Sequence, residues 1–241
     1  MIRPRTASAL FTSALVVALV GCATGGSGAT EAPAVATAAG SPASSPPFSP
    51  AVAAPAAPSP EPPPAETART RPAVLSVPAI GVEELKVVPY QGTTDDRAGT
   101  RIQDRGVAAS PYGPEGGVGP GEKGNYLVTA HRLSAGAPLR DLPALKEGDT
   151  VRVTADGTVY EYRITETRTT SFRSARSLAE QRAAVPGEPG ARPVKAMITL
   201  STCATPEDDA AGNFWRDALG NPEHRIDKVG VLVSSAKAPA G

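Results

Sequence analysis

The sequence predicts an all-β domain, either a closed β-barrel or a β-sandwich. Short runs of β-branched and apolar residues recur between turn signals over the last ~165 residues. Asp156-Gly157 is a strong two-residue hairpin signal between two alternating arms. Only two segments have helical character. Seven or eight strands with few helices are typical of barrels and sandwiches.

The N-terminal residues 1–22 precede this domain and have the pattern of an export signal. Arg3 and Arg5 are followed by an apolar stretch that runs from Ala9 to Val20. This stretch is too short and too early to belong to a globular core. It ends in "LVGC", which resembles a bacterial lipobox, so lipidation of Cys22 is expected. An ordinary signal peptide or an uncleaved anchor helix is the alternative. In each case the chain is expected outside the cytoplasm, anchored at the outer face of the cell membrane.

Residues 23–71 are expected to form a disordered linker between that segment and the domain. They are mostly Ala, Pro, Ser, Gly and Thr, and Phe48 is the only aromatic residue among them. Such a composition buries too little apolar area to offset the entropy of ordering the chain. The domain itself is expected at 72–235, followed by a short tail at 236–241.

The expected strands of the domain follow one another along the chain. The first, 73–82, is interrupted by Pro78 and Gly81, and "ELKVVPY" comes directly after it. The others are expected at 125–132, in the two arms of 149–170, at 194–203 and at 228–235. Short helical turns are expected within 137–149, and a short helix within 174–185.

The net charge of the chain and its number of cysteines limit the classes of function to consider. The formal net charge is zero, which indicates no polyanionic partner such as nucleic acid. The chain has two cysteines, and if Cys22 carries lipid, Cys203 is the one thiol left. An unpaired cysteine in an exported protein is a reactive thiol, an intermolecular bridge or an accident.

Cys203 is expected at the end of the strand "VKAMITLSTC". Alternation puts Ile198 and Leu200 on the core face with Thr202, and puts Cys203 on the more polar face with Ser201. A free cysteine is often only a small buried hydrophobe. A reactive one needs a cationic neighbour that favours the thiolate.

Two histidines could serve as this neighbour. His131 follows the strand "YLVTA", so an adjacent strand end could bring it beside Cys203. His224 lies in the polar segment "GNPEHRID" and is expected to be solvated. His131 is therefore the better candidate for the acid and base.

The motif "TLSTC" matches the signature TLxTC of the sortases. The upstream segment "PGEKGNYLVTAHRLSAGAPLRDLPALKEGD" resembles the sortase segment that carries the catalytic histidine, and "AVLSVPAIGV" resembles the first strand of that family. The arrangement after the histidine resembles class E enzymes most, with class F second. The resemblance covers residues 75–235.

This resemblance implies the eight-stranded sortase β-barrel, with Cys203 as nucleophile and His131 as proton donor. The third residue of the family is an arginine near the start of the last strand, for which Arg225 is the candidate and Lys228 and Arg216 are alternatives. The backbone N–H of Ala204 would assist Arg225 at the oxyanion. Thr202 is expected to contribute to the substrate groove, and the segment 166–192, with its helix, to line that groove. A plain surface connection is the alternative for this segment.

The implied reaction cleaves an LPxTG-like or LAxTG-like sorting signal through a thioester and transfers the acyl group to an amine. The partners would be surface proteins that carry the signal, and a peptidoglycan precursor or a pilin that offers the amine. No metal and no cofactor are implied. A hydrolytic cysteine peptidase, an L,D-transpeptidase and a non-enzymatic lipoprotein with a sortase-like barrel remain alternatives, although "TLSTC" lacks the histidine that usually precedes the cysteine of an L,D-transpeptidase.

Overall fold

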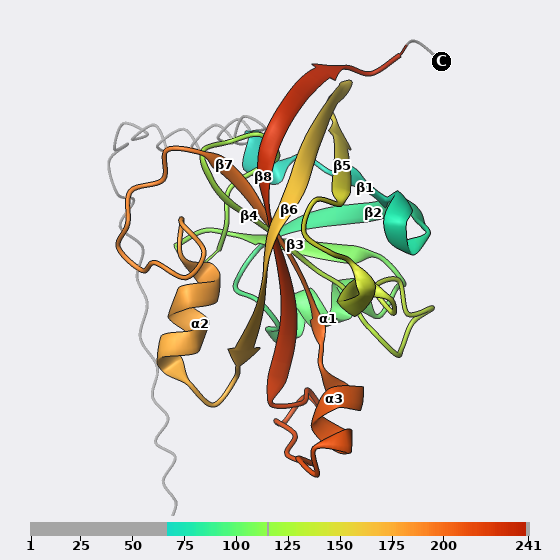
Figure 1. The fold of residues 1–241 in the computed structure, drawn as a ribbon, viewed down its shortest axis with the longest axis vertical. Coiled ribbons are helices and arrows are strands. Elements are labelled where there is room, and N and C mark those ends of the chain that lie inside the picture. Colours follow the sequence, from blue (N-terminus) through green and yellow to red (C-terminus); the bar gives the residue numbers. More distant parts are fainter. Residues whose placement is uncertain (1–66, 115, 240–241) are drawn as a thin grey trace, which may run out of the picture. The chain divides into compact units, whose positions relative to one another are not determined.

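The computed structural model describes residues 67–114 and 116–239 (Figure 1). The predicted signal segment with Cys22 and the linker up to residue 66 lie outside the described residues. No helix among the described residues is long and apolar enough to cross a membrane.

Eight strands form a closed barrel in the order β1-β2-β3-β4-β7-β8-β6-β5. The strands are β1 (Ala73–Val77), β2 (Val82–Gln91), β3 (Ala108–Tyr112), β4 (Gly124–Thr129), β5 (Thr150–Ala155), β6 (Thr158–Ser171), β7 (Ala196–Cys203) and β8 (His224–Lys237). The pairs β2–β3 and β4–β7 are parallel, and the other six are antiparallel. The prediction of an all-β barrel is confirmed, and the alternative of a sandwich is wrong.

Short helices occupy the connections. They are η1 (Ala68–Thr70), η2 (Pro78–Ile80), α1 (Arg97–Gln103), η3 (Leu142–Ala144), α2 (Ala175–Arg182) and α3 (Thr205–Ala210). The helix predicted within 174–185 corresponds to α2, whose N-cap Ser174 accepts a hydrogen bond from Ser177 N. The helical turn predicted within 137–149 is η3. Neither α1 nor α3 was predicted.

The alternation of side chains along the strands builds the core. Large aliphatic side chains from β1, β2, β4, β5 and β7 fill the barrel together with Tyr162 and Ile164 of β6. Ile198 and Leu200 of β7 are fully buried there, as their alternation predicted. The predicted hairpin is also confirmed, because Asp156 and Gly157 both have the left-handed backbone of a tight hairpin turn, with φ of 48° and 65°.

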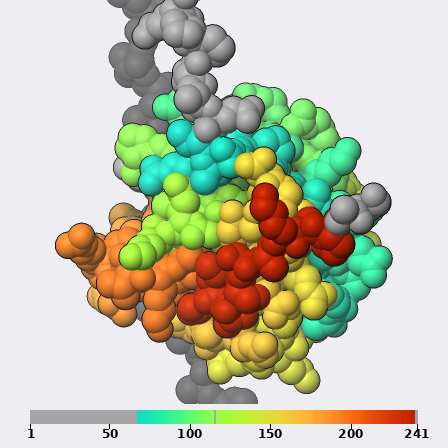
Figure 2. Space-filling model, turned by 90° about the horizontal axis from the view of Figure 1, so that it is seen from above, coloured from blue at the N-terminus to red at the C-terminus, as the bar shows by residue number. Residues whose placement is uncertain are grey.

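Both ends of the predicted domain differ from the structure. Residues 68–70, assigned to the linker, form η1, and Arg69 lies 3.5 Å from the carboxylate of Glu122. At the other end, β8 continues to Lys237, which pairs with Thr158. Figure 2 looks down on this end, where the last residues of β8, in red, lie against the yellow β5–β6 hairpin. The opposite end, where β7 ends and β8 begins, is covered by α3 (Figure 1).

Candidate active site

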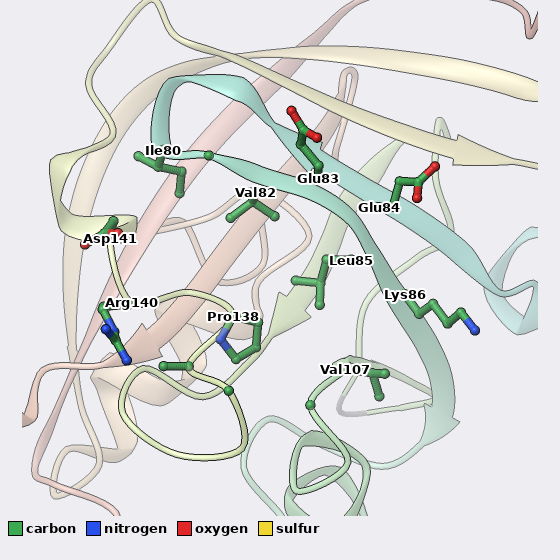
Figure 3. A pocket seen from close by; sticks show the side chains of 14 residues that line it. Ile80, Val82, Glu83, Glu84, Leu85, Lys86, Val107, Pro138, Arg140 and Asp141 are labelled. Atoms are coloured by element: carbon green, nitrogen blue, oxygen red, sulfur yellow. The ribbon is translucent and has the colours of Figure 1, made fainter.

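Cys203 is the last residue of β7, and its half-buried side chain lies on the face that carries Thr199 and Ser201. This is the face opposite to the core residues Ile198 and Leu200, as predicted. The thiol contributes to a cavity of about 320 Å³, whose walls also include His131 and Asn221. A larger hollow of about 640 Å³ lies elsewhere, between the first half of β2 and residues 136–141, and contains neither Cys203 nor a histidine (Figure 3).

Arg225 is the residue of β8 that pairs directly with Cys203. Its Nη1 donates a hydrogen bond to Cys203 Sγ over 2.9 Å. The guanidinium lies over the ring of Phe172, 4.9 Å from its centroid, and the whole residue is only 1% exposed. Strand register therefore brings a permanent positive charge to the thiol.

The two alternative cations lie elsewhere. Lys228 donates to the backbone carbonyls of Pro143 and Leu145 in the segment of η3, and to the Thr167 hydroxyl. Arg216 is paired with Asp209 over 2.5 Å and donates to its neighbour's carbonyl. Of these three cations, Arg225 is the one whose side chain contacts Cys203 Sγ.

His131 reaches the cavity through the parallel pairing of β4 with β7. Thr129 pairs with Ser201, and the backbone N–H of Ala130 then donates to Ser201 O over 3.3 Å. Two residues beyond this pair on each strand, His131 and Cys203 line the same cavity. The ring nitrogen Nε2 of His131 lies 2.9 Å from Asp104 Oδ1.

His224 differs from its prediction as a solvated loop residue. It begins β8, and its Nδ1 lies 2.7 Å from Asp208 Oδ1, while its backbone N–H donates to Oδ2 of the same carboxylate. These contacts tie α3 to β8 and make His224 a structural residue.

Two further expectations require correction. Thr202 is fully buried, and its hydroxyl donates to Ala130 O over 2.8 Å. It thus links β7 to the segment that carries His131 and cannot line a groove. The backbone N–H of Ala204 donates to His224 O over 2.9 Å, because the β7–β8 pairing continues one residue past Cys203. This N–H has no free hydrogen to offer an oxyanion here.

The charges around Cys203 act on its pKa in opposite directions. Burial raises the pKa of the thiol, and the nearby Arg225 lowers it. Asp95 and Asp217 raise it further, whereas Arg132 lowers it. Because burial is the largest effect, the pKa of Cys203 lies above its ordinary value, and the resting site favours the thiol.

Three charged residues near the site were not predicted. Asp95, in the turn between β2 and α1, pairs with Arg225, and Asp104 at the end of α1 pairs with His131. Arg132 forms two hydrogen bonds to the Glu207 carboxylate and donates to Cys203 O over 3.3 Å. In the sequence, Asp95 lies in the polar run "TTDD" and Arg132 follows His131. Neither pattern identifies a partner that is far away in the chain.

The segment between β6 and β7 packs on the outer face of these strands through a buried polar network. Gln181 of α2 donates to Asp227 Oδ1 and to Ser201 Oγ, and accepts a hydrogen bond from Thr94. Thr170 donates to the same Asp227 carboxylate over 2.6 Å. The helix is thereby held beside the strand that delivers Cys203.

No group of three His, Cys, Asp or Glu side chains in the described part of the chain could hold a metal ion. The arrangement around Cys203 is a thiol in contact with one buried guanidinium, with a histidine on the same cavity. Such a set can form an acyl-enzyme, stabilise the oxyanion and exchange a proton with a leaving group.

Comparison with known proteins gives a family match. The family model of the sortase domain matches residues 75–215. Among solved structures, the SrtA sortase from Actinomyces oris has a TM-score of 0.52 at 22% identity, and the match covers 69% of this chain and 82% of that chain. Sortase E1 from Streptomyces coelicolor, with a tripeptide in its active site, has a TM-score of 0.52 at 20% identity over 72% and 94%.

The SrtF sortase from Corynebacterium diphtheriae has a TM-score of 0.51 at 17% identity, with coverage of 73% and 90%. At these identities the similarity concerns the fold, and it extends over several sortase classes without selecting one. No curated protein sequence matches the chain.

Proposed function

The chain belongs to the sortase family, and we propose that it is a cysteine transpeptidase with Cys203 as nucleophile, His131 as proton donor and Arg225 as oxyanion donor. The observation that supports these roles best is the hydrogen bond from Arg225 Nη1 to Cys203 Sγ, beside a cavity that His131 also lines. A thiolate needs a cation nearby, and the leaving amine needs an acid.

In the first step the ionised form of Cys203, a minority at rest, attacks through Sγ the threonine carbonyl carbon of an LPxTG-like or LAxTG-like sorting signal, while His131 carries the proton. The charge that develops on the carbonyl oxygen is stabilised by the guanidinium of Arg225, a contribution of about 3 kcal/mol for one well-placed donor. The bond between threonine and glycine then breaks. His131 protonates the departing glycine amine, and the acyl group stays on Cys203 as a thioester.

In the second step an amine attacks the thioester carbonyl, His131 accepts its proton, and Cys203 is released. Since Asp104 engages Nε2 of His131, we assign Nδ1 as the nitrogen that exchanges this proton. The acceptor would be the amine of a peptidoglycan precursor or of a pilin lysine. The segment 166–192 with α2 would form one wall of the signal-binding groove, since it packs beside the strand that ends in Cys203.

The remaining sequence predictions complete the proposal. Lipidation at Cys22 would hold the domain at the outer face of the cell membrane, and the linker would give it reach to its substrates. Both segments lie outside the described residues.

The test is to incubate the full chain with LPxTG and LAxTG peptides, each with and without an added amine. We expect the amine to appear in a product joined to the threonine of one peptide, and mass spectrometry identifies it. Cys203→Ala serves as the control and should give no product. Cleavage that never incorporates the amine would identify a peptidase instead.

A further inference from the structure

Asp95 forms a buried ion pair with Arg225. Asp95 Oδ1 lies 2.5 Å from Arg225 Nη2, and the two side chains are each 2% exposed. The other terminal nitrogen, Nη1, is the one that contacts Cys203 Sγ. A single planar guanidinium therefore spans the carboxylate on one side and the thiol on the other.

The turn that carries Asp95 is fixed by its own hydrogen bonds. The neighbouring Asp96 is the N-cap of α1, and its carboxylate accepts from Gly99 N over 2.7 Å and from Thr93 N over 3.0 Å. The Tyr90 hydroxyl donates to Thr93 O over 2.6 Å. Asp95 itself has φ of 63°, a conformation that costs energy for a residue other than glycine and that is typically kept at functional positions.

The remaining contacts of Arg225 do not supply a second negative charge at that distance. Nη2 also donates to the neutral amide oxygen of Asn221 over 3.2 Å, and Phe172 contributes its ring face. A buried cation is strongly disfavoured unless a paired anion compensates it. Asp95 is the closest such anion among the described residues, although Asp217 and Asp227 also face the guanidinium.

We infer that Asp95 is a positioning residue that holds Arg225 against Cys203. This inference rests on the proposed roles of Cys203 and Arg225. Without the carboxylate, the guanidinium turns away toward solvent, the thiol loses the cation beside it, and the oxyanion loses its donor. Asp95 thus assists the reaction only by holding Arg225 in place.

Asp95 can affect the ionisation of Cys203 in two ways, through its own charge and through the position of Arg225, and these two effects have opposite signs. The charged groups around the thiol are Arg225 on β8, Asp95 before α1, Asp217 before β8, and Arg132 after β4, with His131 on the same cavity. Loss of the Asp95 charge alone would make Cys203 easier to ionise. Loss of the Arg225 position would make it harder, and Arg225 acts on the pKa of the thiol more strongly than Asp95 does.

The experiment uses the full chain with Asp95→Gly and the matched control Asp156→Gly. Both aspartates have left-handed backbones that glycine adopts freely, and both pair with an arginine, since Asp156 lies 2.7 Å from Arg71. Asp156 lies in the hairpin at the opposite end of β8. The rate of Cys203 alkylation by iodoacetamide is followed against pH by mass spectrometry of the peptide that contains Cys203.

We expect Asp95→Gly to move the alkylation midpoint upward by about half a pH unit or more, and Asp156→Gly to leave it unchanged. With a sorting-signal peptide, kcat should fall at least about tenfold while KM changes less than about threefold. A downward midpoint shift would overturn the inference, because Asp95 would then supply only charge. The alkylation arm needs no substrate, so it gives a result even if the proposed transpeptidation fails.

If Asp95→Gly fails to fold because the buried Arg225 charge has lost its closest anion, a second pair of variants provides the test. Arg225→Gln and the double variant Asp95→Gly/Arg225→Gln both lack the buried Arg225 charge, and only the double variant also lacks the buried Asp95 carboxylate. If Asp95 promotes turnover only through Arg225, these two variants have the same residual kcat, and the double variant, which lacks the Asp95 charge, has an alkylation midpoint no higher than that of Arg225→Gln. A further loss of more than about threefold in the double variant would show an independent role and would refute the inference.

Discussion

Arg225→Lys tests the positive group of the site while it keeps the charge. Arginine uses separate nitrogens for its two partners, with Nη1 on Cys203 and Nη2 on Asp95. Lysine has one ammonium nitrogen on a flexible stem, so it can satisfy one of these partners but not hold the planar arrangement. The exchange therefore removes geometry without removing a charge.

The magnitude follows from the oxyanion contact. One well-placed donor contributes about 3 kcal/mol, and about 1.4 kcal/mol corresponds to a factor of ten in rate. We expect kcat to fall roughly a hundredfold if the lysine nitrogen stays with Asp95, its closest charged partner. KM should change much less, because the contact strengthens only as the oxyanion forms.

The assay is steady-state transpeptidation of a sorting-signal peptide, with melting temperature measured in parallel. Arg216→Lys is the matched control, since it makes the same exchange at an arginine that pairs with Asp209 at the protein surface. It should change kcat less than about twofold, as surface ion pairs contribute little. Equal losses in the two variants, or an unchanged kcat for Arg225→Lys, would refute the assignment of Arg225.

Other expectations concern the remaining residues. Cys203→Ala should abolish the thioester adduct without lowering the melting temperature, and substantial residual turnover would exclude this nucleophile. Because burial raises the pKa of Cys203, its alkylation midpoint should lie above that of glutathione in the same buffer, and a midpoint below it would contradict the described burial. His131→Ala should lower kcat by orders of magnitude, whereas His224→Ala should lower the melting temperature through the lost contact with Asp208 and leave kcat largely intact; the reverse pattern would exchange their roles. Mass spectrometry of the mature N-terminus should show lipid on Cys22, and a chain that retains the residues upstream of it would indicate an anchor helix.

The strand that ends in Cys203 and the strand that leads to His131 could be predicted because their local patterns are strong. Alternation over residues 196–203 assigned both faces of β7 correctly, and the "TLSTC" motif singled out the cysteine for which a catalytic role is proposed. By contrast, β3 was missed because it is short and contains Pro111. Pro111 pairs with Tyr90 of β2, but its carbonyl accepts from Gly117 N on the side away from β2, so its missing N–H faces away from that strand too. On that side β3 pairs with β4 only at Ala109, so no ladder partner requires the N–H.

The partners of the site could not be predicted, for a different reason. Asp95 meets Arg225 across 130 positions of sequence, and no periodicity encodes a contact between a turn and a strand end so far apart. The N–H of Ala204 was misassigned for the same reason, since its use depends on how far the β7–β8 pairing extends. Local sequence indicates which side chains can react, and barrel closure decides what they touch.

The direct pairing of Cys203 with Arg225 has a consequence for how this site tolerates changes in chain length. Deletion of one residue within β7 would turn Cys203 toward the barrel interior while Arg225 stayed outside, because neighbouring strand residues face opposite sides. The β7–β8 pairing has no bulge that could absorb such a slip. Residues 211–220, between α3 and the contacts of Asn221, impose no such alternation. Changes of chain length should therefore be tolerated better in that connection than in the two strands, provided that they spare Asp217, which faces Arg225 and holds Asn221.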